Sequence, residues 1–448
     1  MNQDQAQITV LKFPESVRLR KEMYLIDPNH CLYEIIDNSV DEFSAGRCKN
    51  IYIEITGDPS KPDNFPYVMV KDDGGGIPTT PCKDPDHYNV PQAIVAFSTL
   101  SAGGKFNAAT GYKTNTSGLH GVGASCVNAV SNVFGVQILH DEKLSNIVFK
   151  KGVLESESIN KPVSTLHIDE ELKSGTTIMF QLDETLWTNE KFNFDIVKRR
   201  LKQLSYLNPG LKISYKINYN NFSETHEYFH EKGIEEYFQE LILAKAMLDN
   251  NPILISKTVT DDNVGDININ VALGYSGGYI SEIYSFVNNV NTQGGDHVTG
   301  FNAGLAKAVT NYFASNDKYK SLNKALSNDD TKEGIIAVIS VKVMSPKFEG
   351  QSKASIKMPE VRSAVNSVVY DEVKLYLDQH PNFSKILADK LEKAAKARIA
   401  AKKAREAIRN AKSTLDSSLP GKLSACSSKK PEESEIYLVE GKLQNCPR

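Results

Sequence analysis

The stretch EIIDNSVDEF, residues 34–43, has the pattern of a helix with an acidic face. Glu34, Asp37, Asn38 and Asp41 are spaced so that they share one side of an α-helix. The ordinary explanation is an amphipathic surface helix with a solvated face. Such faces usually pair their carboxylates with Lys or Arg, and this stretch contains neither. The alternative is a functional face, where oxygen ligands hold a divalent cation or a carboxylate takes a proton from water.

The composition is that of a globular protein. The chain has 448 residues, of which 40% are apolar and 24% charged, and its formal net charge is −3. This charge gives no global indication of nucleic-acid binding. The six cysteines are scattered without a C-x-x-C pair, which favours reduced thiols over a disulfide framework or a zinc site. The chain lacks an 18-residue apolar run and its N-terminus is polar, so we expect a cytoplasmic protein with no membrane partner.

Helical and strand patterns alternate along the chain and divide it into four parts. We expect a first α/β domain over residues 1–231, a second over 232–412, a linker over 413–434 and a further segment over 435–448. Strands are predicted at 50–55, 67–73, 135–141, 146–153, 175–182, 267–275, 282–290, 334–343 and 435–441 from alternating or apolar runs. Helices are predicted at 32–46, 124–131, 194–210 and 384–412.

The last of these helices is strongly basic. Residues 384–412 contain ten Lys or Arg residues against three acidic ones. A solvated alanine-rich helix would explain the pattern, and so would a basic stripe that faces the phosphates of a nucleic acid. The sequence leaves both interpretations open.

Two glycine-rich segments follow the acidic helix. The segment VKDDGGGIP, residues 70–78, leaves an apolar strand and contains D-x-G-x-G, where an Asp carboxylate beside a flexible turn could accept a hydrogen bond from an adenine amino group. The segment GLHGVG, residues 118–123, precedes a helical stretch, and backbone N–H groups at such a position suit phosphate. Each segment alone is a weak signal, since tight glycine turns are common.

The order of the motifs is more specific than any one of them. E-x-x-D-N-x-x-D, D-x-G-x-G, GLHGVG and a strand opening with Gly-Thr resemble the GHKL (Bergerat) nucleotide fold. Further motifs, NTQGGDHVTGF at 291–301, PKFEGQSK at 346–353 and SEIYLVEG at 434–441, are similar to the family of the B subunits of DNA gyrase and topoisomerase IV. The resemblance implies an α+β protein: a GHKL α/β sandwich, an α/β transducer domain, a basic helix and the first strand of a TOPRIM domain.

The resemblance also implies roles for the motif residues. Glu34 would be the general base that activates water, and Asn38 would hold Mg²⁺ on the triphosphate of ATP. Asp72 and Thr176 would bind adenine. The other residues that the resemblance assigns to nucleotide binding are Gly76, Ile77 and Pro78 beside the adenine, and Lys105, Gly118, Leu119, His120, Gly121, Val122 and Gly123 over the phosphates.

A loop of the second domain would complete the site. By the resemblance, Gln351 and Lys353 would reach the γ-phosphate, although Ser352 replaces the threonine that is usual between them. A lysine there would neutralise charge on the transferred phosphoryl group. Gly75 stands where gyrases commonly carry Arg, which is a departure beside the adenine pocket.

The resemblance further implies partners. We expect a homodimer that forms on ATP binding, a complex with the gyrase or topoisomerase IV A subunit, and double-stranded DNA as the substrate of strand passage. Glu440 matches the first metal carboxylate of a TOPRIM domain, but the later Asp-x-Asp pair is absent, so the sequence resembles a truncated polypeptide of this family. The B subunit of topoisomerase IV, or a nucleotide-binding module without topoisomerase activity, remains the alternative.

Overall fold

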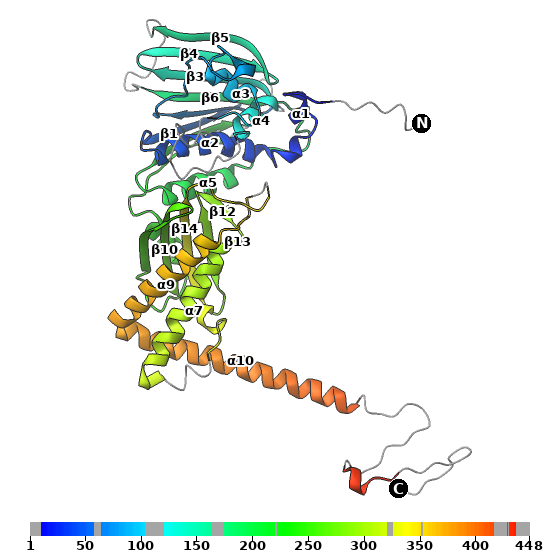
Figure 1. Ribbon diagram of the computed structural model, residues 1–448, viewed down its shortest axis with the longest axis vertical. Helices are drawn as coiled ribbons and strands as arrows, with labels where there is room; N and C mark the ends of the chain where they lie inside the picture. Colours follow the sequence, from blue (N-terminus) through cyan, green and yellow to red (C-terminus); the bar gives the residue numbers. More distant parts are fainter. Residues whose placement is uncertain are drawn as a thin grey trace, which may run out of the picture.

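The computed structural model contains two α/β units that follow each other along the chain (Figure 1). It describes residues 10–57, 64–103, 121–162, 174–219, 222–319, 326–350, 353–415, 428 and 430–435. Within these residues, no helix is long and apolar enough to cross a lipid bilayer. The predicted strand at 435–441 and the residues Lys105, Gly118, Leu119, His120, Gln351 and Glu440 lie outside the described part of the chain.

The first unit is built on an eight-stranded sheet with the order β5-β4-β3-β6-β2-β1-β7-β8. Its pairings are antiparallel except for the parallel pair β1 and β7. The strands are β1 (Asn50–Thr56), β2 (Tyr67–Asp72), β3 (Ser131–His140), β4 (Lys143–Lys150), β5 (Val153–Pro162), β6 (Gly175–Leu182), β7 (Lys212–Tyr219) and β8 (Phe222–Tyr228). The helices are α1 (Glu15–Arg18), α2 (Pro28–Ser44), α3 (Gln92–Ser98), α4 (Gly123–Ala129) and α5 (Phe194–Leu207).

Alternating burial explains how this sheet holds its helices. In β1 the isoleucines at 51, 53 and 55 are buried while their neighbours are partly exposed, as expected for a strand with one core-facing side. They join the apolar faces of α2 and α5 in one hydrophobic core, which includes Ile36, Val40 and Leu201. The strong apolar face of α2 therefore fixes the helix against the sheet and leaves its acidic face turned aside.

The second unit contains a five-stranded sheet with the order β12-β11-β14-β10-β9. The strands are β9 (Ile253–Asp261), β10 (Gly265–Tyr275), β11 (Glu282–Val287), β12 (Val290–Thr292) and β14 (Ile335–Val343). The helices are α6 (Ile234–Ile242), α7 (Asp296–Ser315), α9 (Pro359–Gln379) and α10 (Pro381–Leu415), and short β13 (Gly294–Gly295) pairs with β15 (Ser355–Ile356). Helices α7 and α9 share a second hydrophobic core with this sheet.

A small apolar cluster joins the two units. Tyr206 and Leu207, at the end of α5, pack with Tyr237 of α6, Phe286 of β11 and Val338 of β14. Helix α5 therefore contributes to the core of the first unit and to the contact with the second sheet. In Figure 1, α5 lies between the two sheets.

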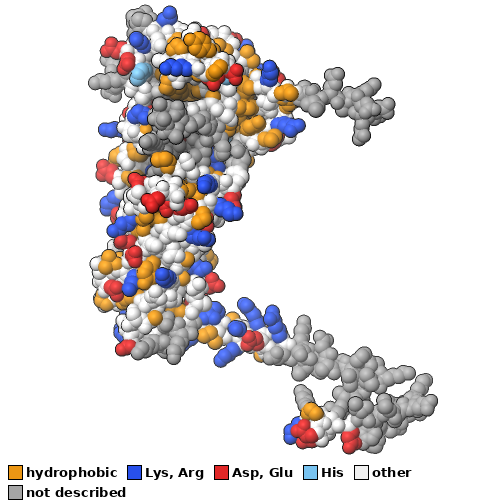
Figure 2. Space-filling view, in the orientation of Figure 1, with side chains coloured by type: hydrophobic (Ala, Val, Ile, Leu, Met, Phe, Trp, Pro, Cys, Tyr) orange, Lys and Arg blue, Asp and Glu red, His pale blue; other side chains and the backbone are white. Residues whose placement is uncertain are grey.

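The last helix leaves the body of the protein. Leu387, Leu391 and Ala395 are buried against the second unit, whereas all of residues 400–409 are exposed. Figure 1 shows α10 extending away from the second unit, and Figure 2 shows Lys and Arg side chains gathered where it leaves. An exposed helix without an apolar face fits a solvated or ligand-binding element.

The structure confirms the predicted α+β architecture and most of the predicted elements, and it corrects three of them. The predicted strand at 146–153 ends at Lys150, because Lys151 and Gly152 take positive φ angles of 51° and 83° and turn the chain into β5. Residues 282–290 form no single strand, because Asn288 and Asn289 take positive φ angles of 44° and 68° and make a hairpin turn between β11 and β12. Asparagine tolerates that left-handed conformation better than other residues with a side chain. The predicted helix at 124–131 begins at Gly123 and ends at Ala129, and Ser131 already belongs to β3.

Candidate functional site

A cavity of about 660 Å³ opens between α2, the sheet of the first unit and a loop of the second unit. Such a volume is typical of small-molecule sites. The cavity collects, from separate segments of the chain, the predicted site residues within the described part: Glu34, Asn38, Asp72, Gly76, Ile77, Pro78, Gly121, Val122, Gly123, Thr176 and Lys353. The fold therefore brings together residues that lie more than 300 positions apart in the sequence.

Helix α2 supplies the acidic wall of the cavity. The side chain of Asp27 caps its N-terminus by accepting a hydrogen bond from the backbone N–H of His30 at 2.7 Å, and Pro28 occupies the first turn. Because α2 begins at Pro28, its apolar residues face the core, and Glu34 and Asn38 line the cavity. Of the acidic face noted in the sequence, Glu34, Asn38 and Asp41 line the cavity, whereas Asp37 does not.

The carboxylate of Glu34 lies at the centre of three contacts. Its Oε1 is 3.3 Å from Nε2 of His30 and 3.8 Å from Nζ of Lys353. Its other side lies against Gly123, the first residue of α4, where a Cβ atom would come within 2.7 Å of the Glu34 Cδ. Glycine at 123 is therefore a packing requirement of the Glu34 carboxylate, since real Cβ contacts are not that short.

Asn38 has a defined amide orientation. Its Nδ2 donates a hydrogen bond to the backbone oxygen of Glu34 at 3.0 Å. The side-chain oxygen is then the atom with which Asn38 can ligate a hard cation. Among the described residues, no group of three His, Cys, Asp or Glu side chains is arranged to hold a metal, so a cation here would keep other oxygen ligands.

Asp72 also lines the cavity and is 5% exposed. Sheet register places it directly across from Thr176, since the last residue of β2 pairs with the second residue of β6. Its carboxylate accepts hydrogen bonds from Ser39 Oγ at 2.7 Å, from the Gly74 N–H at 2.9 Å and from the Thr176 N–H at 3.3 Å. Burial raises the pKa of Asp72, and these three donors oppose that rise.

Part of the cavity lining is apolar. Ile35, Val70, Ile77 and Ile178 line the cavity, and Gly76 takes a positive φ of 75° that brings the chain close to Ile138. An apolar slot that ends in a fixed carboxylate suits a flat heteroaromatic ring carrying an amino group.

Three contributors to the site were missed by the sequence analysis. Ser39 bonds to Asp72, His30 contacts Glu34, and Arg200 pairs with Asp37 at 3.2 Å. The helical period of α2 could have indicated His30, which precedes Glu34 by one turn. The other two depend on contacts between residues 33 and 163 positions apart in the chain.

Gly75 is bordered by a guanidinium from another position. Arg47 makes a double hydrogen bond to Glu42 at 2.8 and 2.7 Å, and its side chain lies against Gly75. Glu42 also accepts the Gly75 N–H at 3.3 Å and lines the cavity. Position 75 itself carries no side chain, and the Arg47–Glu42 pair lies against it.

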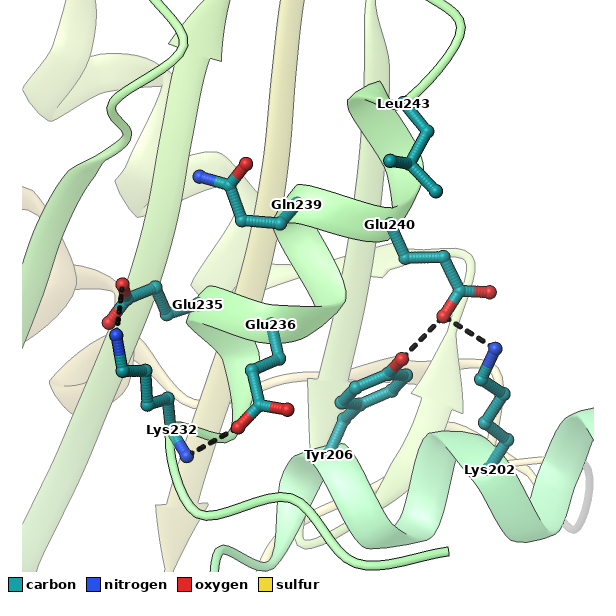
Figure 3. Close-up of a pocket in the computed structure, with 8 residues that line it drawn as sticks. All are labelled: Lys202, Tyr206, Lys232, Glu235, Glu236, Gln239, Glu240 and Leu243. Atoms are coloured by element: carbon teal, nitrogen blue, oxygen red, sulfur yellow. Dashed lines mark hydrogen bonds and ion pairs between the residues drawn. The ribbon is translucent and has the colours of Figure 1, made fainter.

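A second hollow, of about 500 Å³, lies between α5 and α6 (Figure 3). Its charged groups pair with one another: Glu240 with Lys202 at 2.7 Å and with the Tyr206 hydroxyl, and Lys232 with Glu235 at 3.5 Å. Mutual pairing favours a role in bracing the two helices over ligand binding.

The comparisons with known proteins agree with this geometry. Residues 25–186 match the family model described as histidine kinase-, DNA gyrase B-, and HSP90-like ATPase, and residues 233–407 match the model described as DNA gyrase B. The DNA gyrase B protein of Helicobacter pylori is 40% identical over 97% of this chain. The chain belongs to the DNA gyrase B family. It spans about half the length of the curated relatives it matches, 54% in the H. pylori case.

Solved structures of the family give the same result for the fold. The 43K ATPase domain of Thermus thermophilus gyrase B, solved with an aminocoumarin, has a TM-score of 0.66 and 30% identity over 88% of this chain and 97% of its own. The topoisomerase IV ATP-binding domain of Francisella tularensis, solved with an inhibitor, has a TM-score of 0.67 and 27% identity over 86% of this chain and 97% of its own. The described part of the chain therefore has the fold of these ATPase domains.

Proposed function

We propose that this chain is the ATP-binding and ATP-hydrolysing part of a type II DNA topoisomerase of the gyrase kind. The observation that carries the proposal is the single cavity that holds Glu34, Asn38, Asp72 and Lys353 together. We further propose a GHKL ATPase domain over residues 1–231, a transducer domain over 232–412 and a linker over 413–434. Two separate hydrophobic cores support the division into two domains.

Adenine would occupy the end of the cavity near Asp72 and Thr176. The apolar walls there accept a flat ring, and the buried Asp72 carboxylate would accept a hydrogen bond from the exocyclic amino group. Gly76, Ile77 and Pro78 border the same end. The phosphates would then extend toward Gly121, Val122 and Gly123, and we assign Lys105 and residues 118–120 to the same lid.

Glu34 is the proposed general base. Lys353 and His30 hold its carboxylate at the other end of the cavity, where it can take a proton from an attacking water. Asn38 is one turn further along α2, and its side-chain oxygen fits a Mg²⁺ ligand. When bound, Mg²⁺ would neutralise phosphate charge. Lys353 would add positive charge beside the γ-phosphate, and we assign Gln351 to the same loop.

The wider activity of the complete protein is also a proposal. ATP binding would close a homodimer that gates passage of a DNA duplex, together with a gyrase or topoisomerase IV A subunit. The exposed basic side chains of α10 support contact with DNA phosphates, since they lie along a helix that protrudes from the second unit (Figure 2). We assign Glu440 to the metal site of the DNA-cleaving part.

The proposal is tested by the variant Glu34→Ala. It should bind ATP and still dimerise, but its turnover should fall by about 10²–10⁴-fold, the usual effect of losing a general base. Sedimentation with a non-hydrolysable ATP analogue should show a shift from monomer toward dimer for both proteins. Near-normal turnover in the variant, or failure of the unaltered chain to bind ATP, would defeat the proposal.

The B subunit of topoisomerase IV is the second candidate. The likeness to the F. tularensis domain supports it as a close relative of the same site. Because both candidates share the ATPase chemistry, the discriminating assay is supercoiling of relaxed plasmid against decatenation of linked circles, with the complete protein and its A partner.

A further inference from the structure

Arg200, in the middle of α5, contacts both units of the protein. Its Nη1 donates a hydrogen bond to the backbone oxygen of Asn289 at 2.6 Å, in the turn between β11 and β12. Its Nη2 donates to Oδ1 of Asp37 on α2 at 3.2 Å, and its guanidinium lies over the ring of Tyr33, 5.9 Å from the centroid. The side chains of Arg200 and Asp37 are only 12% and 16% exposed. One guanidinium therefore links the helix of the candidate nucleotide site to the second sheet.

The turn that Arg200 holds is itself fixed to the second sheet. The side chain of Asn288 donates to the backbone oxygen of Val343 at 2.8 Å and accepts from the Val343 N–H at 2.9 Å. Asn289 is 1% exposed. The carbonyl that accepts from Arg200 is thus a rigid part of the second unit.

Helix α5 is bound to the second unit at its other end as well. Tyr206 and Leu207 pack against Tyr237 and Phe286, and Nζ of Lys342 on β14 donates to Oδ1 of Asn208 at 2.9 Å. The ion pair between Lys202 and Glu240 ties α5 to α6 (Figure 3). Helix α5 is therefore packed against the second sheet as well as in the core of the first unit, and Arg200 reaches α2 from it.

On α2, the residues that Arg200 contacts lie next to the residues that line the cavity. Tyr33 and Asp37 are one turn apart, and at about 100° per residue they lie roughly 100° around the helix from Glu34 and Asn38, respectively. Because a helix moves as a rigid element, a shift that re-aims Glu34 and Asn38 also displaces Tyr33 and Asp37. The Asp37 side chain is only 16% exposed, so removing the guanidinium that pairs with its carboxylate would be energetically unfavourable.

We propose that Arg200 is a positioning residue that couples the orientation of α2 to the β11–β12 turn, so that nucleotide binding at the site is transmitted to the second unit. This inference rests on the proposed ATP function of the cavity. Lys353 makes the other link from the second unit to α2, through Glu34, but that contact lies in the cavity and a bound phosphate would compete for it. The Arg200 contact lies beside the cavity and persists when the cavity is filled.

The test compares hydrogen exchange in the β11–β12 segment, residues 282–292, with and without a non-hydrolysable ATP analogue. The unaltered chain should show a nucleotide-dependent change in exchange there. Arg200→Met should bind the analogue with affinity within about threefold of normal but lose the change. Its kcat should fall about 2- to 30-fold, which corresponds to the usual range of coupling energies in packed networks. Arg200→Lys should recover only part of the effect, because an ammonium cannot span both acceptors as a guanidinium does.

Lys198→Met is the matched control. Lys198 lies on the same helix and is also ion-paired, with Glu224 at 3.0 Å, but this pair stays within the first unit. It should keep both the nucleotide-dependent change and the normal kcat. If Arg200→Met fails to fold, Asp37→Leu removes the acceptor of the same link with a side chain of similar size and should give the same loss.

The possible results separate the two proposals. If the unaltered chain does not bind the analogue, the proposed function and this inference both fail. If it binds and Arg200→Met or Asp37→Leu retains the change in residues 282–292, the coupling role is refuted while the ATP function stands. If Lys198→Met also lost the nucleotide-dependent change in exchange, the coupling role of Arg200 would be refuted, since any perturbation of α5 would then be enough to abolish that change.

Discussion

The close approach of Gly123 to Glu34 gives a quantitative prediction. In the variant Gly123→Ala, the new Cβ would overlap the Glu34 carboxylate and lie 2.7 Å from its Cδ. Carbon atoms in contact are normally about 3.5–4.0 Å apart, so the carboxylate must move by about 1 Å. A misplacement of that size in an active site typically costs about 10²-fold in rate. We therefore expect the kcat for ATP hydrolysis to fall about 10²-fold.

The fold should survive this change. Gly123 is the first residue of α4 and has no left-handed φ angle, so alanine is compatible with its backbone. The severe contacts are with the carboxylate end of Glu34, which can rotate away, whereas the contact with the Glu34 Cβ at 3.2 Å needs only a small shift. A small gain in helix propensity, up to about 1 kcal/mol, offsets part of the strain. The melting temperature should change by only a few degrees.

Coupled-assay kinetics on four proteins test the reasoning: the unaltered chain, Gly123→Ala, Glu34→Ala and the double variant. If the alanine acts by displacing the Glu34 carboxylate, the double variant should be no slower than Glu34→Ala alone. Gly135→Ala is the control, since its Cβ would meet only the Met179 carbonyl oxygen at an ordinary 3.8 Å. Additive losses in the double variant, or an unchanged kcat in Gly123→Ala, would refute the argument.

Three further predictions concern affinity, pH and DNA. Asp72→Asn should weaken ATP binding about 10- to 100-fold by calorimetry, because a hydrogen bond to a charged acceptor is removed; unchanged affinity would remove Asp72 from the adenine site. Burial lowers the pKa of His297 to about 4, below the unfolded value of about 6.5, so the unfolded state binds more protons in this range. Stability in denaturant titrations should therefore fall by up to about 3 kcal/mol as the pH drops from 6.5 to 4, and His297→Asn should flatten that slope. Duplex DNA binding should weaken steeply as the salt concentration rises. Replacing Lys403 and Arg405 with Gln should lower the slope of log affinity against log salt concentration by about 0.9 for each phosphate that α10 no longer neutralises.

Much of the fold was predictable because its periodic patterns are strong. The alternation in residues 175–182 gives the bounds of β6 without error, and the acidic stripe of residues 34–43 lies on a helix as expected. The split of residues 282–290 into two strands was not predicted, since an apolar and aromatic run hides the Asn288–Asn289 turn. Left-handed backbone at asparagine depends on the tertiary hydrogen bonds of the turn, which a local pattern does not reveal.

The residues that line the cavity could be nominated from the sequence, but the contacts between them could not. The motifs nominate Glu34, Asn38 and Asp72, and the cavity collects them. The hydroxyl that bonds to Asp72 comes from Ser39, on the face of α2 where the sequence suggests core. A buried serine among isoleucines has no signal of its own, because its partner lies on strand β2 and only the packing of α2 on the sheet brings them together.

The acidic stripe of α2 lacked basic neighbours in the sequence, and the structure explains why. The cations that face it come from remote positions: Arg200 of α5 reaches Asp37, and Lys353 of the second unit reaches Glu34. Local Lys or Arg residues would pair with these carboxylates permanently and independently of the second unit. Arg200 belongs to the first unit, but Lys353 comes from the second, so the charge balance at Glu34 depends on how the two units are placed. A helix with a carboxylate paired from another unit is therefore suited both to hold a nucleotide and to report its presence.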